Sequence, residues 1–156
     1  MKNIVVLGGG FAGVAACLNL LKKIDKNQET LTLVDQNTFH LFTPALYEVA
    51  TSEQPQKNIA IPYRHIFKSK LDILTDTVTS VDWKSKKIIF KKNKNLHWDY
   101  LIIALGSQSA YFDIPGMEKY SIPLKTLEDA VKIKENIQKL YFQKSSQNQE
   151  MHLVVA

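Results

Sequence analysis

The sequence contains only one cysteine, Cys17, among its 156 residues. A lone cysteine cannot form an internal disulfide, and without a C-x-x-C or C-x-x-x-x-C pair the chain cannot perform dithiol chemistry by itself. The four histidines, at positions 40, 65, 97 and 152, lack the spacing of metal ligands, so we expect no metal site. Cys17 is expected to be a small buried residue of a helix.

Long hydrophobic runs are also missing. No segment approaches the roughly 20 consecutive apolar residues that a membrane-spanning helix needs. The first residues do not form a cleavable signal, because glycines interrupt the apolar run at once. With 45% hydrophobic residues and this length, the chain can build a globular domain with a hydrophobic core. We therefore expect a cytoplasmic protein.

The chain is weakly basic, with a formal net charge of +5 that comes mostly from lysine. Six lysines crowd into residues 84–94, in the turn region of an expected hairpin. A solvated hairpin tip is the main interpretation, and attraction to an anionic membrane surface is the alternative. Nucleic-acid binding is not expected, because neither arginine nor aromatic residues alternate with these lysines.

The most informative segment is the first 35 residues. An apolar strand over residues 3–7 runs into Gly8-Gly9-Gly10-Phe11-Ala12-Gly13, and a helix-compatible stretch follows over 14–23. A second apolar strand over 31–34 ends at Asp35. This order of strand, glycine turn, helix and strand is typical of a dinucleotide-binding fingerprint.

Each part of such a fingerprint has a physical role. Gly8 permits the tight turn, Gly10 lets a diphosphate approach the backbone, and Gly13 lets the helix pack closely on the strand. The amino end of the helix offers free N–H groups to phosphate. Asp35 lies 22 residues after Gly13, where its carboxylate can accept hydrogen bonds from a ribose and repel a 2′-phosphate. A glycine-rich turn without a ligand is the alternative.

The middle of the chain changes from helix to strand. Thr43 and Pro44 predict the N-cap and first residue of a short helix that reaches about Ala50, and a second short helix is expected over 62–67. Several strands follow. Three are expected to form an antiparallel meander, and the last, apolar throughout, is expected to be buried on both faces of a parallel sheet. These segments are 73–74, 77–83 and 87–90 for the meander and 100–105 for the buried strand.

The last part of the chain predicts a helix, a linker and a strand. Thr126 can cap a helix whose apolar residues keep helical spacing to about Phe142. A polar linker is expected over 144–150, and residues 151–156 predict a new strand.

Three segments resemble a known family. His40-Leu-Phe-Thr-Pro-Ala-Leu-Tyr-Glu-Val-Ala50 resembles a signature of type II NADH dehydrogenases, which pass electrons from NADH to quinone. Residues 99–106 are similar to a strand-and-turn element of the wider FAD-dependent pyridine nucleotide-disulfide oxidoreductases. Residues 112–131 resemble the crossover to their second nucleotide-binding domain.

The resemblance implies an α/β fold: a Rossmann-like FAD-binding domain with a parallel sheet and a small antiparallel meander, incomplete at its C-terminus. It implies the N-terminal part of an FAD-binding domain over 1–125, a connecting helix and linker over 126–150, and the first strand of a truncated NADH-binding domain over 151–156. The chain would match about the N-terminal two-fifths of such an enzyme. By itself it is expected to be inactive, because NADH would use the part that is missing.

The resemblance further implies a set of FAD-binding residues and no catalytic side chain. The loop would hold the diphosphate, Asp35 the adenosine ribose, Val78 the adenine through its backbone, and the Thr43–Pro44 pair would lie beside the flavin. The implied residues are Gly8, Gly10, Phe11, Ala12, Gly13, Asp35, Gln36, Thr43, Pro44, Val78, Ala104 and Gly106. NADH and quinone would be the substrates, and peripheral attachment to the cytoplasmic face of a membrane would use C-terminal segments outside this sequence.

Alternatives remain open. Another two-domain flavin reductase, such as a sulfide:quinone enzyme, is one, although Cys17 lies outside the flavin-proximal positions that those enzymes use. A truncated, non-catalytic FAD-binding module is the second. A single-domain NAD-dependent dehydrogenase is disfavoured by the antiparallel meander. Val78 can instead be only a core residue of a strand, Thr43 and Pro44 can serve only to start a helix, and His40 is expected to be structural.

Overall fold

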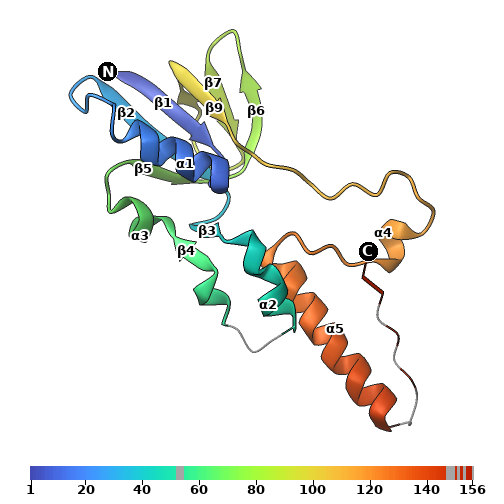
Figure 1. The fold of residues 1–156 in the computed structure, drawn as a ribbon. Helices are drawn as coiled ribbons and strands as arrows, with labels where there is room; N and C mark the ends of the chain where they lie inside the picture. Colours follow the sequence, from blue (N-terminus) through green and yellow to red (C-terminus); the bar gives the residue numbers. More distant parts are fainter. Residues whose placement is uncertain (52–54, 147–149, 151, 153, 156) are drawn as a thin grey trace. The chain divides into compact units, whose positions relative to one another are not determined.

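The structure is a computed structural model that describes residues 1–51, 55–146, 150, 152 and 154–155. These residues form two units, one built from 1–41 and 60–107 and the other from 42–59 and 108–156. The first unit contains every strand of the described chain together with two of its helices (Figure 1). The second is helical.

The first unit is built on a parallel four-stranded sheet with the strand order β5-β2-β1-β9. The central pair, β1 and β2, is apolar because its residues are covered on both faces, as parallel strands require. In register, Val5 lies opposite Thr32 on β2 and Leu101 on β9. The strands are β1 (Lys2–Leu7), β2 (Glu29–Asp35), β5 (Asp72–Thr75) and β9 (Tyr100–Ile103).

Helices cover one face of this sheet. Ile4 and Val6 of β1, with Leu31 and Leu33 of β2, pack against Cys17 and neighbouring residues of α1 (Phe11–Leu20). The same cluster takes in Tyr63 and Phe67 of α3 (Tyr63–Phe67). Cys17 is fully buried, as predicted, and burial raises the pKa of its thiol to about 12. It is therefore a thiol at neutral pH and no nucleophile.

A small antiparallel sheet covers the other face. Val5, Leu7 and Val34 form a second buried cluster with Ile88 and Phe90 of this sheet and with Trp98, which directly follows it. Its strands are β6 (Val78–Asp82), β7 (Lys87–Phe90) and β8 (Leu96–His97). The first unit therefore has three layers: helices, parallel sheet and meander.

Two of the strand predictions are wrong. Residues 73–74 do not belong to the meander. They lie in β5, which follows α3 in the chain and pairs in parallel with β2. The third meander strand is instead β8, too short for its alternation to be visible in the sequence. The segment 100–105 does join the parallel sheet, but β9 is an edge strand, and Tyr100 and Ile103 are 53% and 52% exposed. Its apolar character therefore does not mean that both its faces are buried here.

A two-stranded antiparallel ladder connects the sheet to α3. β3 (Phe39–Leu41) pairs with β4 (Ala60–Pro62), and His40 lies opposite Ile61. The Tyr63 N–H donates to the Thr38 carbonyl at 3.1 Å, which sets the start of α3 directly beside β3. The short helix expected over 62–67 is confirmed.

The second unit contains the remaining helices. α2 (Leu46–Thr51) packs against the long α5 (Leu127–Ser146), and its buried residues are Leu46, Val49 and Ala50. The short segments are η1 (Thr43–Ala45), η2 (Gln56–Asn58) and α4 (Met117–Tyr120). None of the described helices is long and apolar enough to cross a membrane.

The helix ends test the capping predictions. Thr126 caps α5 as expected: its Oγ1 accepts from the Asp129 N–H at 3.1 Å, and the Asp129 carboxylate accepts from the Thr126 N–H at 2.8 Å. Thr43 is not an N-cap, because it is already the first residue of η1, and no side chain caps that turn. α1 begins three residues earlier than predicted, with Gly10 as its N-cap.

The C-terminal predictions fall partly outside the described residues. The linker expected from residue 144 is wrong at its start, because α5 continues to Ser146, while 147–149 are not described. Of the strand expected over 151–156, residues 151, 153 and 156 are not described. His152, Val154 and Val155 belong to no strand, since a strand requires a neighbour to pair its backbone groups.

Candidate functional site

The glycine turn lies at the carboxyl end of β1, between the ends of β2 and β9. Gly8 has a φ of +95°, in the region that side chains rarely adopt, and its N–H donates to the Val34 carbonyl at 2.8 Å. A Cβ at Gly8 would lie 2.3 Å from the carbonyl oxygen of Ala104. The tight-turn role predicted for Gly8 is confirmed, and Ala104 is the backbone that it passes.

Gly13 and Gly10 differ in the space around them. A Cβ at Gly13 would lie only 1.7 Å from the Gly8 carbonyl oxygen and 3.5 Å from Val6 Cγ1 of β1, so the predicted close packing of the helix on the strand is confirmed. A Cβ at Gly10 would meet nothing within 4 Å, and this residue is exposed. The turn is thus closed beneath Gly13 and open above Gly10, where a ligand could approach the backbone.

Gly9 is held at both its N–H and its carbonyl group, a role that the glycine pattern did not predict. Its N–H donates a short hydrogen bond to Asp35 Oδ2. Its carbonyl oxygen accepts from the Tyr63 hydroxyl at 3.1 Å and lies 3.0 Å from His40 Nδ1. Both side chains are buried.

Asp35 ends β2 half-buried, as the fingerprint predicts. Besides Gly9, its carboxylate accepts from the Asn37 N–H at 2.7 Å through Oδ1. Burial, and then the negative charge of Asp35, raise the pKa of Tyr63 well above its usual range. Tyr63 therefore stays protonated and able to donate.

The other predicted residues lie in different surroundings. Phe11 and Ala12 are exposed in the first turn of α1, and the Phe11 ring meets the His40 ring edge-on at 4.9 Å between centroids. Gln36 is exposed directly after β2, and Gly106 has a φ of +75° two residues beyond Ala104.

Val78 and the Thr43–Pro44 pair belong to other parts of the chain. Val78 begins β6 and packs, half-buried, against the Val5, Leu7 and Val34 cluster, so its role as a core residue is confirmed. Thr43 and Pro44 are exposed in η1 of the second unit. The structure thus brings together the residues of the turn, Asp35 and Ala104.

The site carries amide donors and an acid instead of a metal cluster. The first turn of α1 has backbone N–H groups without helical partners, and the axis of the helix adds partial positive charge. No acidic side chain stands in that first turn to compete for these donors. Among the described residues, no group of three or more His, Cys, Asp and Glu is arranged to hold a metal ion. The arrangement can bind an anion at the turn and a hydroxyl-bearing group near Asp35.

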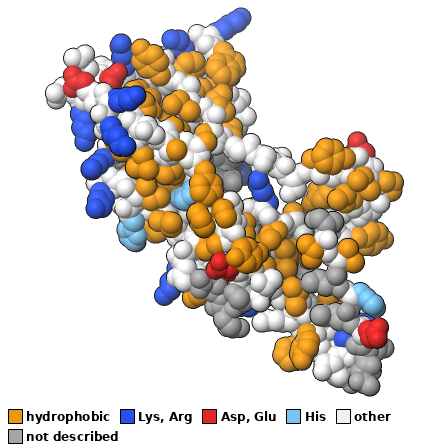
Figure 2. All heavy atoms as spheres, in the orientation of Figure 1, with side chains coloured by type: hydrophobic (Ala, Val, Ile, Leu, Met, Phe, Trp, Pro, Cys, Tyr) orange, Lys and Arg blue, Asp and Glu red, His pale blue; other side chains and the backbone are white. Residues whose placement is uncertain are grey.

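The lysine-rich segment does not form one block. Lys84 and Lys86 precede β7, whereas Lys91, Lys92 and Lys94 follow it, so the strand separates them into two turns. Figure 2 shows Lys and Arg side chains scattered over the outer margin of the first unit. This distribution fits solvated turns.

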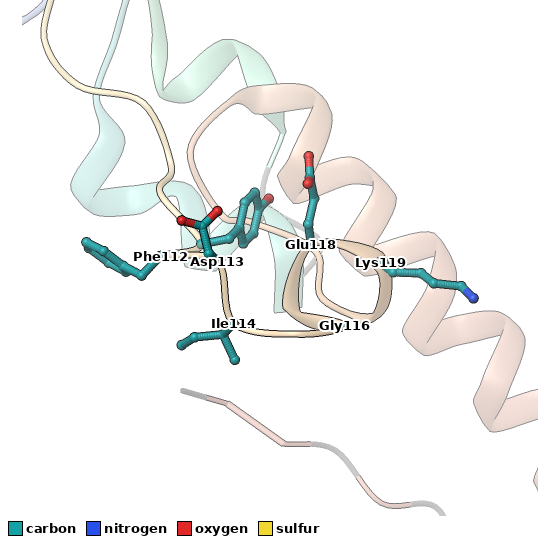
Figure 3. Close-up of a pocket in the computed structure, with 7 residues that line it drawn as sticks. Phe112, Asp113, Ile114, Gly116, Glu118 and Lys119 are labelled. Carbon is teal, nitrogen blue, oxygen red and sulfur yellow. The ribbon is translucent and has the colours of Figure 1, made fainter.

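A hollow in the second unit is a weaker candidate. It is shallow and open, and it is lined by residues of the segment 111–119. Phe112 and Asp113 have φ values of +51° and +56°, an uncommon conformation for such residues. Figure 3 shows the Lys119 side chain extending in a different direction from those of Asp113 and Glu118, so its charged groups do not converge on a ligand there.

The three-layered unit and its glycine turn define a Rossmann-type nucleotide-binding fold, with the site at the carboxyl ends of parallel strands. The chain belongs to the pyridine nucleotide-disulphide oxidoreductase family, whose sequence model matches residues 2–155.

Two relatives and one solved structure show which members of the family this chain is similar to. The chain is 35% identical over 145 residues to a demethylphylloquinone reductase of Synechocystis, covering 88% of this chain and 36% of that protein. It is 28% identical to a type II NADH:quinone oxidoreductase of Staphylococcus haemolyticus, covering 88% and 34%. The fold resembles the crystal structure of the sulfide:quinone oxidoreductase of Aquifex aeolicus, with a TM-score of 0.80, 27% identity and coverage of 91% and 33%. The chain thus spans about a third of the length of these relatives.

Proposed function

We propose that this chain is the FAD-binding part of a flavoprotein NADH:quinone oxidoreductase, in which hydride passes from NADH to FAD and electrons then pass to quinone. The observation that carries the proposal is the open backbone at Gly10, set directly above a closed glycine turn and beside the Asp35 carboxylate. A diphosphate needs such an opening, and a ribose needs such an acceptor. The residues present therefore fit a dinucleotide such as FAD.

The proposed binding residues divide by the part of FAD that they would meet. The backbone from Gly8 to Gly13, with Phe11 and Ala12 in the first helical turn, would hold the diphosphate. Asp35 and Gln36 would bind the adenosine ribose, and the backbone of Val78 would meet the adenine. Thr43, Pro44, Ala104 and Gly106 would lie near the flavin. When bound, FAD supplies the redox chemistry, and the protein supplies orientation and a water-poor site.

The division of the chain remains part of the proposal. Residues 1–125 would belong to the FAD domain, 126–150 would connect, and 151–156 would start the NADH-binding domain. NADH and quinone would be the substrates of the longer protein, which would be cytoplasmic and peripheral on the cytoplasmic face of the membrane. The chain spans about a third of the length of these relatives, which leaves room in them for a second nucleotide-binding domain.

A sulfide:quinone reductase is the second candidate, because that fold matches with a TM-score of 0.80. Cys17 does not supply a reactive thiol for it, because this thiol is fully buried and its pKa is raised to about 12. A reactive thiol needs access and a thiolate at neutral pH. A non-catalytic FAD-binding module differs from both of these enzymes in one measurable property: the longer protein would bind FAD but would not reduce quinone with NADH or with sulfide.

Titration of the purified chain with FAD tests the proposal. We expect saturable binding, followed by the visible absorption of the flavin that remains after gel filtration. Asp35→Ala should weaken FAD binding by tenfold or more, because it removes the ribose acceptor and the support of Gly9 together.

Asp72→Ala is the matched control. It removes a carboxylate from the exposed start of β5, in the same sheet but away from the carboxyl ends of the strands. This variant should retain FAD like the wild type. If Asp35→Ala stayed fully loaded, the ribose role would be refuted, and a wild-type chain that took up no FAD would refute the proposed function.

A further inference from the structure

Three side chains from three elements hold one residue of the glycine turn, Gly9. Asp35 of β2 accepts from the Gly9 N–H, while Tyr63 of α3 and His40 of β3 both meet the Gly9 carbonyl oxygen, at 3.1 and 3.0 Å. A carbonyl oxygen has two lone pairs, so it can accept from both. Because a carbonyl only accepts, His40 must carry its proton on Nδ1. We call Asp35, His40 and Tyr63 the Gly9 clamp.

The clamp determines where the next amide points. The described chain contains no cis peptide bond, and in a planar trans peptide the C=O and N–H groups point in opposite directions. Since the Gly9 carbonyl is held against two buried side chains, the Gly10 N–H is directed away from the core. The backbone is also open at this residue, because a Cβ at Gly10 would meet nothing within 4 Å.

We propose that His40 and Tyr63 are positioning residues for the diphosphate: by fixing the Gly9 carbonyl, they aim the Gly10 N–H at the phosphate oxygens before the ligand arrives. This inference rests on the proposed FAD site and deepens it. A turn of consecutive glycines has many accessible conformations, and ordering it costs conformational entropy. The clamp orders the turn when the protein folds, so less conformational entropy is lost when FAD binds.

The ladder of β3 and β4 explains how two distant residues meet. His40 and Tyr63 are 31 and 54 residues beyond Gly9 in the sequence. The pairing of Phe39 with Pro62 places the start of α3 beside β3, so that both side chains reach the same oxygen. A Cβ at Gly9 would lie 1.8 Å from the Tyr63 hydroxyl oxygen, so only glycine leaves room for the clamp.

The test compares FAD affinity with fold stability in side-chain variants of the full 156-residue chain. Tyr63→Phe removes one donor and keeps the ring. His40→Asn places an amide nitrogen where Nδ1 stood, whereas His40→Gln places it where Nε2 stood. Each single variant leaves the carbonyl one other donor, so we expect folding to persist. The matched controls are His65→Gln, at an exposed position of α3, and Tyr47→Phe, at an exposed position of α2.

We expect Tyr63→Phe and His40→Gln each to raise the FAD dissociation constant roughly two- to tenfold, as the loss of one hydrogen bond predicts. His40→Asn should restore the wild-type value to within about twofold. A positioning role requires this loss of affinity in variants that are fully folded at the temperature of the titration, and the melting temperature without FAD identifies those variants.

The outcomes separate the two proposals. If the wild type binds FAD but Asn and Gln at position 40 weaken it equally, or Tyr63→Phe binds like the wild type, the positioning role is overturned while the FAD site stands. If Tyr63→Phe does not fold, the comparison of Asn with Gln decides alone. A wild-type chain that binds no FAD overturns the proposed function and this inference with it.

Discussion

At the scale of single residues, the glycines of the turn show what a short pattern can predict. The spacing of Gly8, Gly10 and Gly13 was enough to predict a tight turn, an open approach and close packing, and the structure confirms all three. These properties are local, since each depends on backbone within a few residues or on the neighbouring strand. The support of Gly9 was not predictable, because its partners, His40 and Tyr63, come from distant segments.

The same geometry predicts opposite behaviour for two alanine substitutions. Gly13→Ala should destabilise the fold by about 1–3 kcal/mol, because the new Cβ would overlap the Gly8 carbonyl oxygen and force the helix outward. Gly10→Ala should leave stability nearly unchanged, since its Cβ meets no atom, but should weaken FAD binding by blocking the approach of the diphosphate. Thermal unfolding without FAD and FAD titration of both variants measure the two effects. Equal losses of stability would contradict this division of roles.

At the scale of elements, the sequence predicted the beginning of the sheet better than its later strands. β1 and β2 are buried centrally, so their apolar runs report their position directly. β5 and β8 were misassigned because strands of four and two residues carry too little pattern to show which sheet they join. Pairing in this region depends on the turn between the two sheets, which only the structure shows.

Asp76 fixes that turn and makes it sensitive to acid. The residue is buried, and its carboxylate accepts from the backbone N–H groups of Thr77, Lys92 and Asn93 and from the Asn93 side chain. Burial alone would raise the pKa of Asp76, but these hydrogen bonds outweigh it, and the pKa is held below its usual value. A lowered pKa means that the stabilisation is complete above the pKa of the unfolded chain, about 4, and is lost as the pH falls through the folded value.

Asp76→Asn tests this linkage. We expect the variant to unfold at a lower urea concentration than the wild type at pH 7, and the difference to shrink as the pH falls below about 4. Asn93→Ala removes one side-chain donor but keeps the carboxylate, so it should cause a smaller loss at pH 7. Urea titrations at several pH values measure these midpoints. A difference between wild type and Asp76→Asn that stayed constant with pH would show that the carboxylate charge is not responsible.

At the scale of the whole molecule, the positions of the glycines limit the number of glycine-turn nucleotide sites in this sequence. Four of the six glycines lie in the turn of residues 8–13, and the other two, Gly106 and Gly116, form no second fingerprint. The relatives are about three times as long as the matched region. A reductase that uses NADH to reduce FAD must bind two nucleotides at once, and this sequence provides the loop for one.

We therefore expect the 156-residue polypeptide, once loaded with FAD, to show no bleaching of its flavin absorption when NADH is added. Dithionite is the control: as a small reductant that needs no binding site, it should bleach the same sample and show that the flavin can be reduced. Stopped-flow absorbance with each reductant measures both reactions. NADH-dependent bleaching that saturates with NADH concentration while FAD remains bound would mean that this sequence holds a nicotinamide site of its own, and the argument from one fingerprint would be wrong.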